Sequence, residues 1–278
     1  MPGFPLTAWA VDFPWGDDVD VALDRLRDEA EPLFEPRTVE PTAIIERMGS
    51  ACARACSRFG RSRVAVVLGS TATPETSEAL LRAVQERTTI TGPAYCVAAA
   101  GIGGAKAVVS AEYLLRATIA DAVVVGGIDE HGGALILIEK HGDAFVRLAA
   151  VSESTDPGNA ESQGPSAAER ALTRAHDQGR PQPLGYLHLH AAPSSSNHHA
   201  QRRIAQTVLG SAPHCTTPTV LRATGAAAGA LETVLAAASL VRGYTPQPRP
   251  AELEHDRVIV HAAGDDGHHV ALMLEART

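Results

Sequence analysis

The stretch GPAYCVAAAGIGGAKAVVSAEYLLRATIADAVVVGG, residues 92–127, holds a short apolar segment, a longer segment and a second apolar segment. In residues 102–117 apolar side chains recur every three or four positions, which predicts a helix packed on a sheet. The segment before it, Gly92–Gly101, is a strand candidate. The segment after it, Asp121–Gly127, and the earlier segment Arg63–Gly69 are nearly continuous apolar runs rich in β-branched residues. Such runs are typical of strands buried on both faces. A strand, a helix and a strand in this order indicate parallel strands joined by a helical crossover.

The same alternation extends to both sides of this stretch. Further strands are predicted at residues 6–11, 63–69, 183–190 and 217–221. Further helices are predicted at residues 17–29, 41–59, 167–177, 197–209 and 226–242 and within residues 70–84, where threonine and proline are placed to start one. Two hairpins are expected, one turning at His141–Asp143 and one made by residues 257–264 and 268–275.

A polar segment with proline and glycine, residues 157–166, is the natural linker between two similar parts of the chain. We expect an N-terminal half over residues 1–155 and a C-terminal half over residues 156–278. Each half alternates strands with helices and closes on two antiparallel strands. Two such α/β halves rich in βαβ units, packed together, predict five layers in the order α-β-α-β-α.

Composition narrows the class of protein. Hydrophobic residues make up 45% of the 278 and aromatic residues 4%, so small aliphatic side chains must form the core. The formal net charge is −8, which argues against a nucleic-acid partner. The sequence begins without a cationic and apolar leader, and no apolar run reaches the roughly 18 residues of a membrane span. We therefore expect a cytoplasmic protein that binds no membrane and keeps its four cysteines reduced.

Five segments, in this order, resemble motifs of the β-ketoacyl synthase family, whose fold is thiolase-like. They are GPAYCVAAAG (92–101), DAVVVGGIDE (121–130), PLGYLHLHAAPSSS (183–196), TVLRATGAAAGALETVLAAASLVRGYTPQ (219–247) and VHAAGDDGHHVALMLE (260–275). The first resembles the strand that ends in the family's nucleophilic cysteine, and the third resembles the segment that carries the first catalytic histidine. The fourth resembles the segment with the family's lysine and second histidine. Because the segments cover most of the chain, the resemblance implies the family's five-layer fold.

Carried over position by position, the family's catalytic groups are mostly missing. The nucleophile falls on Gly101, which has no side chain to acylate. The first histidine is retained as His190. The second falls on Ala223, or on Ala226 if a two-residue gap is allowed, and alanine can neither donate nor accept a proton. The resemblance therefore implies a degenerate member, similar to a chain length factor, that does not condense acyl groups by itself.

The resemblance also implies a partner and a surface. Members of the family dimerise by pairing the strand before the nucleophile across a two-fold axis, which places the interface at Gly92, Pro93, Tyr95 and Val97. The implied partner is an active ketosynthase in a heterodimer, or a second copy of this chain in a homodimer. An acyl carrier protein is a further candidate partner. The implied pathway is type II fatty acid, polyketide or aryl polyene biosynthesis.

Two other functions remain open from the residues. The chain could be a divergent acyltransferase, decarboxylase or 3-oxoacyl carrier-protein synthase that uses His190, with Cys96 as the nucleophile. It could also be a homodimeric binding protein without activity. We expect no metal, because the paired histidines lack cysteine or carboxylate at a recognised spacing. We expect no cofactor, because Lys106 stands where a dinucleotide loop starting at Gly101 would need its last glycine.

Overall fold

The structure is a computed structural model that describes residues 3–14, 16–28, 40–71, 73–99, 101–156, 166–179, 182–190, 196–216, 224–247, 249–264 and 266–277. Its strands are β1 (Phe4–Asp12), β2 (Val64–Ser70), β3 (Ala94–Ala98), β4 (Ala122–Asp129), β5 (Gly132–Glu139), β6 (Val146–Thr155), β7 (Tyr186–Leu189), β8 (His214–Thr216), β9 (Arg257–Ala263) and β10 (His268–Ala276). Its helices are α1 (Val19–Asp28), α2 (Pro41–Phe59), α3 (Pro74–Thr88), α4 (Gly103–Arg116), α5 (Ala167–Gln178), α6 (Ser196–Leu209) and α8 (Ala228–Arg242). Short 3₁₀ turns are η1 (Arg61–Arg63) and η2 (Gly225–Ala227).

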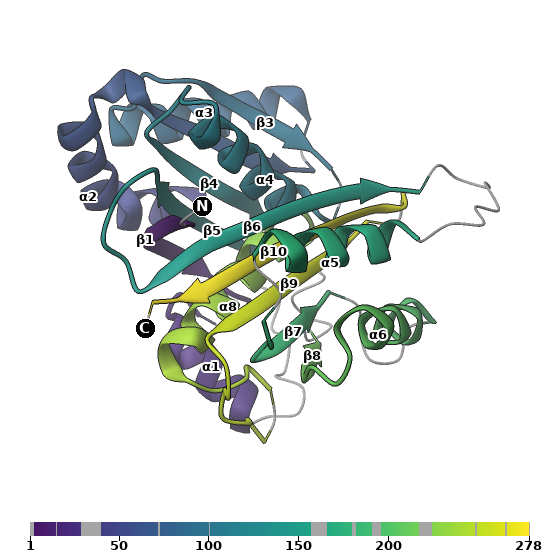
Figure 1. Cartoon of the computed structure of the whole chain (residues 1–278). Coiled ribbons are helices and arrows are strands. Elements are labelled where there is room, and N and C mark those ends of the chain that lie inside the picture. Colours follow the sequence, from purple (N-terminus) through teal and green to yellow (C-terminus); the bar gives the residue numbers. More distant parts are fainter. Residues whose placement is uncertain are drawn as a thin grey trace.

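The ten described strands form one sheet in the order β3-β2-β4-β5-β1-β6-β10-β9-β7-β8 (Figure 1). In the first five, β2 runs parallel to β3 and β4, whereas β5 is antiparallel to β4 and β1. In the last five, β7 runs parallel to β8 and β9, whereas β10 is antiparallel to β9 and β6. The two five-stranded parts thus repeat one plan. They meet where β1 pairs with β6, at Phe4–Leu148 and Pro5–Arg147.

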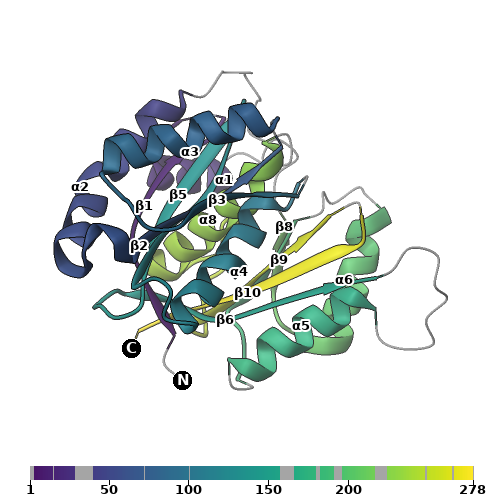
Figure 2. The same cartoon turned by 90° about the horizontal axis from the view of Figure 1, so that it is seen from above.

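The helices cover both faces of each part and give the predicted α-β-α-β-α order (Figure 2). Side chains of α2 and α3 pack on the outer face of the first part, and those of α5 and α6 on the outer face of the second. Helices α4 and α8 lie between the two parts and share a single core with both. The five-layer α/β prediction is confirmed.

Helix α8 is buried on all sides because it lies in the middle layer. Every residue from Ala228 to Leu240 is buried, which explains why this segment is rich in alanine and has no polar stripe. Among the described helices, Gly225–Arg242 is long and apolar enough to cross a membrane, but 83% of that stretch is buried inside the protein. Its burial is that of a helix in a protein core.

One predicted hairpin forms and the other does not. Strands β9 and β10 pair over Arg257–Ala263 as expected. The hairpin expected around residues 141–143 is wrong, because β1 lies between β5 and β6 and pairs with both. Apolar alternation does not reveal which strand lies beside which, and here a strand distant in sequence separates two neighbours. The strand expected at 217–221 lies outside the described residues. The division of the chain at residues 155 and 156 stays a prediction, while strand pairing places β6 with the later strands.

Candidate functional site

Gly101 lies in the tight turn between β3 and α4. Its φ angle is +72°, in the left-handed region that glycine adopts without strain. A Cβ atom built on Gly101 would meet no described residue within 4 Å. The position at which the resemblance places a nucleophile is therefore a strand-to-helix turn, and it carries no side chain.

Close packing of small residues brings the start of α4 against the start of α8. A Cβ on Gly104 would lie 2.8 Å from the carbonyl oxygen of Ala226 and 2.8 Å from the amide nitrogen of Ala230. A Cβ on Gly69, at the end of β2, would lie 2.1 Å from the carbonyl carbon of Gly103. The run of glycines after Gly101 thus permits close approach of backbones at this end of the middle layer.

Asp129, at the end of β4, forms hydrogen bonds that connect the ends of β2 and β4 to the start of α8. One carboxylate oxygen, Oδ2, accepts a hydrogen bond from the Thr71 hydroxyl at 2.8 Å and from the Ala226 amide at 3.2 Å. The other oxygen, Oδ1, accepts from the Glu130 amide at 2.8 Å. The carboxylate therefore connects the ends of β2 and β4 to the start of α8. Sequence analysis did not single out Asp129, although it stands within the motif at residues 121–130.

His190 follows β7 and is held by a buried carboxylate. Its Nδ1 atom lies 2.7 Å from Oε1 of Glu232 on α8, and its backbone amide donates to the carbonyl of His261 at 3.2 Å. The His190 side chain is 10% exposed and that of Glu232 is 0% exposed. An ionised carboxylate only accepts hydrogen bonds, so beside one the imidazole donates its proton from Nδ1. Sequence analysis predicted His190 but missed Glu232, which lies 42 residues away and becomes its neighbour only in the folded protein.

Other histidines nearby are buried as well. Burial lowers the pKa of His188, and Cys215 Sγ lies 3.7 Å from its Nδ1 atom. His261 is fully buried and stacks on His269 with ring centroids 5.3 Å apart. Burial and, to a lesser extent, His269 and His190 lower the pKa of His261 to about 3. Within the described residues no group of three or more histidine, cysteine or carboxylate side chains is placed to hold a metal ion.

The cysteines do not supply a thiolate to the turn at Gly101. Cys96 packs with the outer core under α2 and α3, and its Sγ atom donates to the carbonyl of Ser77 at 3.7 Å. Its strand neighbour Val97 packs with the inner core, so Cys96 lies on the sheet face opposite α4 and α8. Burial raises the pKa of Cys96, and burial raises the pKa of Cys52 to about 12. Burial likewise raises the pKa of Cys56 and of Cys215.

The predicted interface residues lie on and before β3, which forms one edge of the sheet among the described strands. Tyr95 and Pro93 are exposed, and Gly92 and Val97 are half-buried. A Cβ on Gly92 would lie 2.2 Å from the carbonyl oxygen of Val64, so glycine lets this segment approach β2. The structure thus brings together the start of α4, which follows Gly101, the start of α8 and the end of β4. Ala223 lies outside the described residues.

Comparison with known proteins supports the fold. No protein-family model matches the sequence, and neither does any curated protein. A ketosynthase in complex with its chain length factor from Xenorhabdus doucetiae is 18% identical over 99% of this chain and 98% of that chain, with a TM-score of 0.78. The ishigamide ketosynthase/chain length factor is 15% identical over 99% of both chains, also at 0.78. A type II polyketide ketosynthase in complex with its acyl carrier protein is 13% identical over the whole of both chains, at 0.80.

These likenesses and the five layers define a thiolase-like fold. The similar structures are ketosynthases and their pairs with chain length factors, and they match this chain from end to end. The chain therefore has the fold of ketosynthases and chain length factors.

Proposed function

We propose that this protein is a non-condensing subunit, similar to a chain length factor, that pairs with an active ketosynthase in type II fatty acid, polyketide or aryl polyene biosynthesis. The observation that carries the proposal is Gly101. The strand-to-helix turn that would present a nucleophile is present, and no described residue lies within 4 Å of a Cβ built on it, yet the residue has no side chain. Covalent acylation at this point has no acceptor atom.

The thiols support the same proposal. A reactive cysteine needs a lowered pKa and access, which a helix N-terminus or a nearby cation supplies. Here the pKa of Cys96 is raised by burial, and its side chain lies on the far face of the sheet from α4. Three cysteines, Cys52, Cys56 and Cys215, are buried. None of these side chains is a substitute for the missing nucleophile.

Strand β3 is the surface proposed for the partner. An edge strand presents unpaired backbone groups that a strand from another chain can continue. Tyr95 on β3 is exposed and its neighbours on the strand are small. No other described strand pairs with this edge of β3. An active ketosynthase would supply the cysteine and the second histidine, and this subunit would contribute surface. An acyl carrier protein would then be a ligand of the pair, in the cytoplasm.

A second candidate function rests on the pair formed by His190 and Glu232. A buried histidine oriented by a carboxylate is an arrangement suited to general acid–base catalysis. The protein would then be a divergent acyltransferase or decarboxylase that acts without a covalent intermediate. The distinguishing property is turnover by the isolated chain.

The first test is the mass of the intact protein after incubation with acyl carrier protein thioesters. The proposal predicts no acyl adduct and no release of carbon dioxide from a malonyl thioester by the isolated chain. A stoichiometric adduct would overturn it, and turnover that His190→Ala abolishes would establish the second candidate.

The second test concerns pairing. The chain is co-expressed with an active type II ketosynthase, and the mass of the complex is measured by light scattering. We expect a one-to-one complex that Tyr95→Glu on β3 disrupts. Tyr113→Glu is the matched control, because Tyr113 is also an exposed tyrosine but lies on α4. If the chain forms a homodimer and does not bind the ketosynthase, the result would favour a homodimeric binding protein and would overturn the proposal of a ketosynthase partner.

A further inference from the structure

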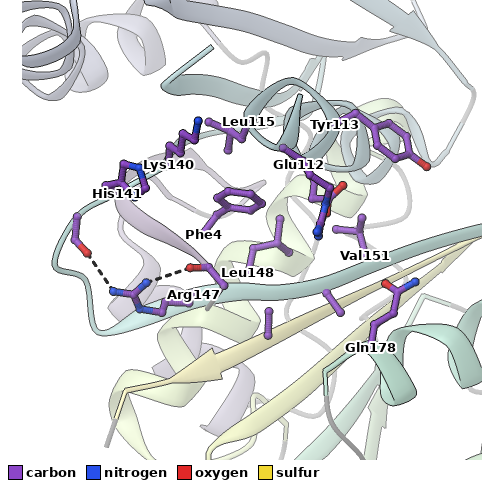
Figure 3. A pocket seen from close by; sticks show the side chains of 15 residues that line it. Phe4, Glu112, Tyr113, Leu115, Lys140, His141, Arg147, Leu148, Val151 and Gln178 are labelled. Carbon is purple, nitrogen blue, oxygen red and sulfur yellow. Dashed lines mark hydrogen bonds and ion pairs between the residues drawn. The ribbon is translucent and has the colours of Figure 1, made fainter. Parts of the chain in front are cut away.

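A large cavity lies at the seam where β1 meets β6, far from Gly101. Its volume is about 870 Å³, and its lining comes from the start of β1, the end of α4, the loop after β5, the first part of β6 and the end of α5 (Figure 3). Helix α4 separates it from Gly101, because its 14 residues at about 1.5 Å each span roughly 20 Å. The cavity is therefore separate from the site described above. Volumes of about 300–1,000 Å³ are typical of small-molecule pockets.

The middle of the cavity is apolar. Phe4 projects between α4 and β6, with Leu115 on one side and Leu148 on the other (Figure 3). Phe4 is half-buried, whereas Leu115, Leu148 and Val151 are buried. A half-buried aromatic ring over aliphatic side chains is a surface on which an alkyl chain gains free energy by leaving water.

One end of the cavity is basic. Lys140 and His141 lie side by side there, and Arg147 lies across from them (Figure 3). The Arg147 guanidinium donates to the carbonyl oxygens of Gly3 and Gly142, each at 3.0 Å. These two hydrogen bonds hold the Arg147 guanidinium in one orientation. Because backbone carbonyls are uncharged, they do not neutralise its positive charge.

The acidic lining residue of the cavity does not offset these cations. Glu112 is buried and forms an ion pair with Arg116, which also lines the cavity. This pair is neutral as a unit, so the charges of Lys140 and Arg147 remain in excess among the lining side chains. Asp121, outside the lining, also attracts Lys140, but that carboxylate already pairs with Arg63 at 2.8 Å. Lys140 itself donates to the Thr118 hydroxyl at 2.9 Å, which leaves two of its three ammonium protons for other acceptors.

We infer that this cavity binds a small amphipathic anion, with its acid group beside Lys140 and Arg147 and its apolar chain over Phe4, Leu148 and Val151. The chemistry requires one anionic head, either carboxylate or phosphate, and an alkyl or aryl body. The ligand contacts β1 and β6 together, so it bridges the seam between the two five-stranded parts. The inference does not rest on the proposed pairing with a ketosynthase.

The sequence offers a direct test, because the chain has just two lysines, Lys106 and Lys140. Both are half-buried, but Lys106 lies on the first turns of α4 with its Nζ atom 3.0 Å from His268. Reductive methylation with ¹³C-formaldehyde gives separate NMR signals for the two side chains and the amino terminus. Octanoate, octyl phosphate and neutral octanol are then added to the labelled protein.

We expect octanoate or octyl phosphate to shift the Lys140 signal in a saturable way and to leave Lys106 unchanged, and octanol to bind more weakly. The two anions distinguish a carboxylate head from a phosphate head. By calorimetry Lys140→Gln should weaken anion binding roughly tenfold, as loss of a charge-assisted hydrogen bond does, and Lys106→Gln should leave it unchanged. Equal binding of octanol and the anions, or equal effects of the two lysine substitutions, would overturn the inference. Circular dichroism of each variant shows whether it is folded.

Discussion

Replacing Gly104 by alanine tests the contact that forms the candidate site. The new Cβ would lie 2.8 Å from the Ala226 carbonyl oxygen and 2.9 Å from the Ala230 Cβ atom, closer than such atoms approach one another. Helix α4 or α8 must move, and overpacking of this kind costs about 1–3 kcal/mol. For a chain of this size a loss of about 2 kcal/mol lowers the melting temperature by roughly 4–8 °C.

The matched control is Gly49→Ala on α2. Gly49 also lies inside a helix, but a Cβ there would meet no described residue within 4 Å. Alanine is up to about 1 kcal/mol more favourable than glycine in a helix, so this variant should melt roughly 2–4 °C higher. Scanning calorimetry of the two variants should therefore show shifts of opposite sign. If Gly104→Ala is as stable as the wild type, α4 and α8 do not approach as closely as the structure describes, and the account of the glycine run is refuted.

Three further predictions concern the histidines and the turn. Burial lowers the pKa of His261 to about 3, whereas the ordinary pKa of histidine is 6.5. Between these two pH values the unfolded chain binds a proton at His261 and the native state does not. The free energy of unfolding should therefore be highest above pH 6.5 and should fall as the pH falls toward 3. In urea unfolding, His261→Gln should reduce the dependence of this free energy on pH by about 1 kcal/mol per pH unit. An unchanged dependence would contradict the lowered pKa of His261. Gly101→Cys should give no condensation of acyl and malonyl thioesters, because alanine stands where the second histidine is needed, and product formation by this single variant would disprove that alignment. His190→Ala should destabilise the fold by about 1–3 kcal/mol in urea unfolding, because it removes the 2.7 Å hydrogen bond to the buried Glu232 side chain, and a neutral effect would show that the pair contributes nothing.

The sequence predicted the layers because each element carries its own periodicity. The helix at Pro41–Phe59 was predicted to the residue, since proline opens it and Gly60 follows it. The continuous apolar runs at β2 and β4 correctly indicated strands buried on both faces. These signals are local, so a single chain is enough to read them.

Local sequence patterns could not predict the order of the strands or the contacts of the candidate site. Nothing in residues 132–155 shows that β1, more than 120 residues earlier, lies between the two strands of the expected hairpin. The Glu232 carboxylate and the Asp129 carboxylate each stand in a recognisable motif, but their partners come from other motifs. Pairing across 42 and 97 residues is a property of the fold, not of a local pattern.

The position of β10 has a consequence for how the protein is made. This strand, at residues 268–276, lies between β6 and β9 and pairs with both along most of its length. Strands β6 to β9 are synthesised earlier, but their shared sheet cannot close until the ribosome has released residue 276. Until then the edges of β6 and β9 are unpaired and open to other chains. A synthesis pause within the last strand, or loss of a few residues there, should therefore leave the first five-stranded part near its native form and the second prone to aggregation.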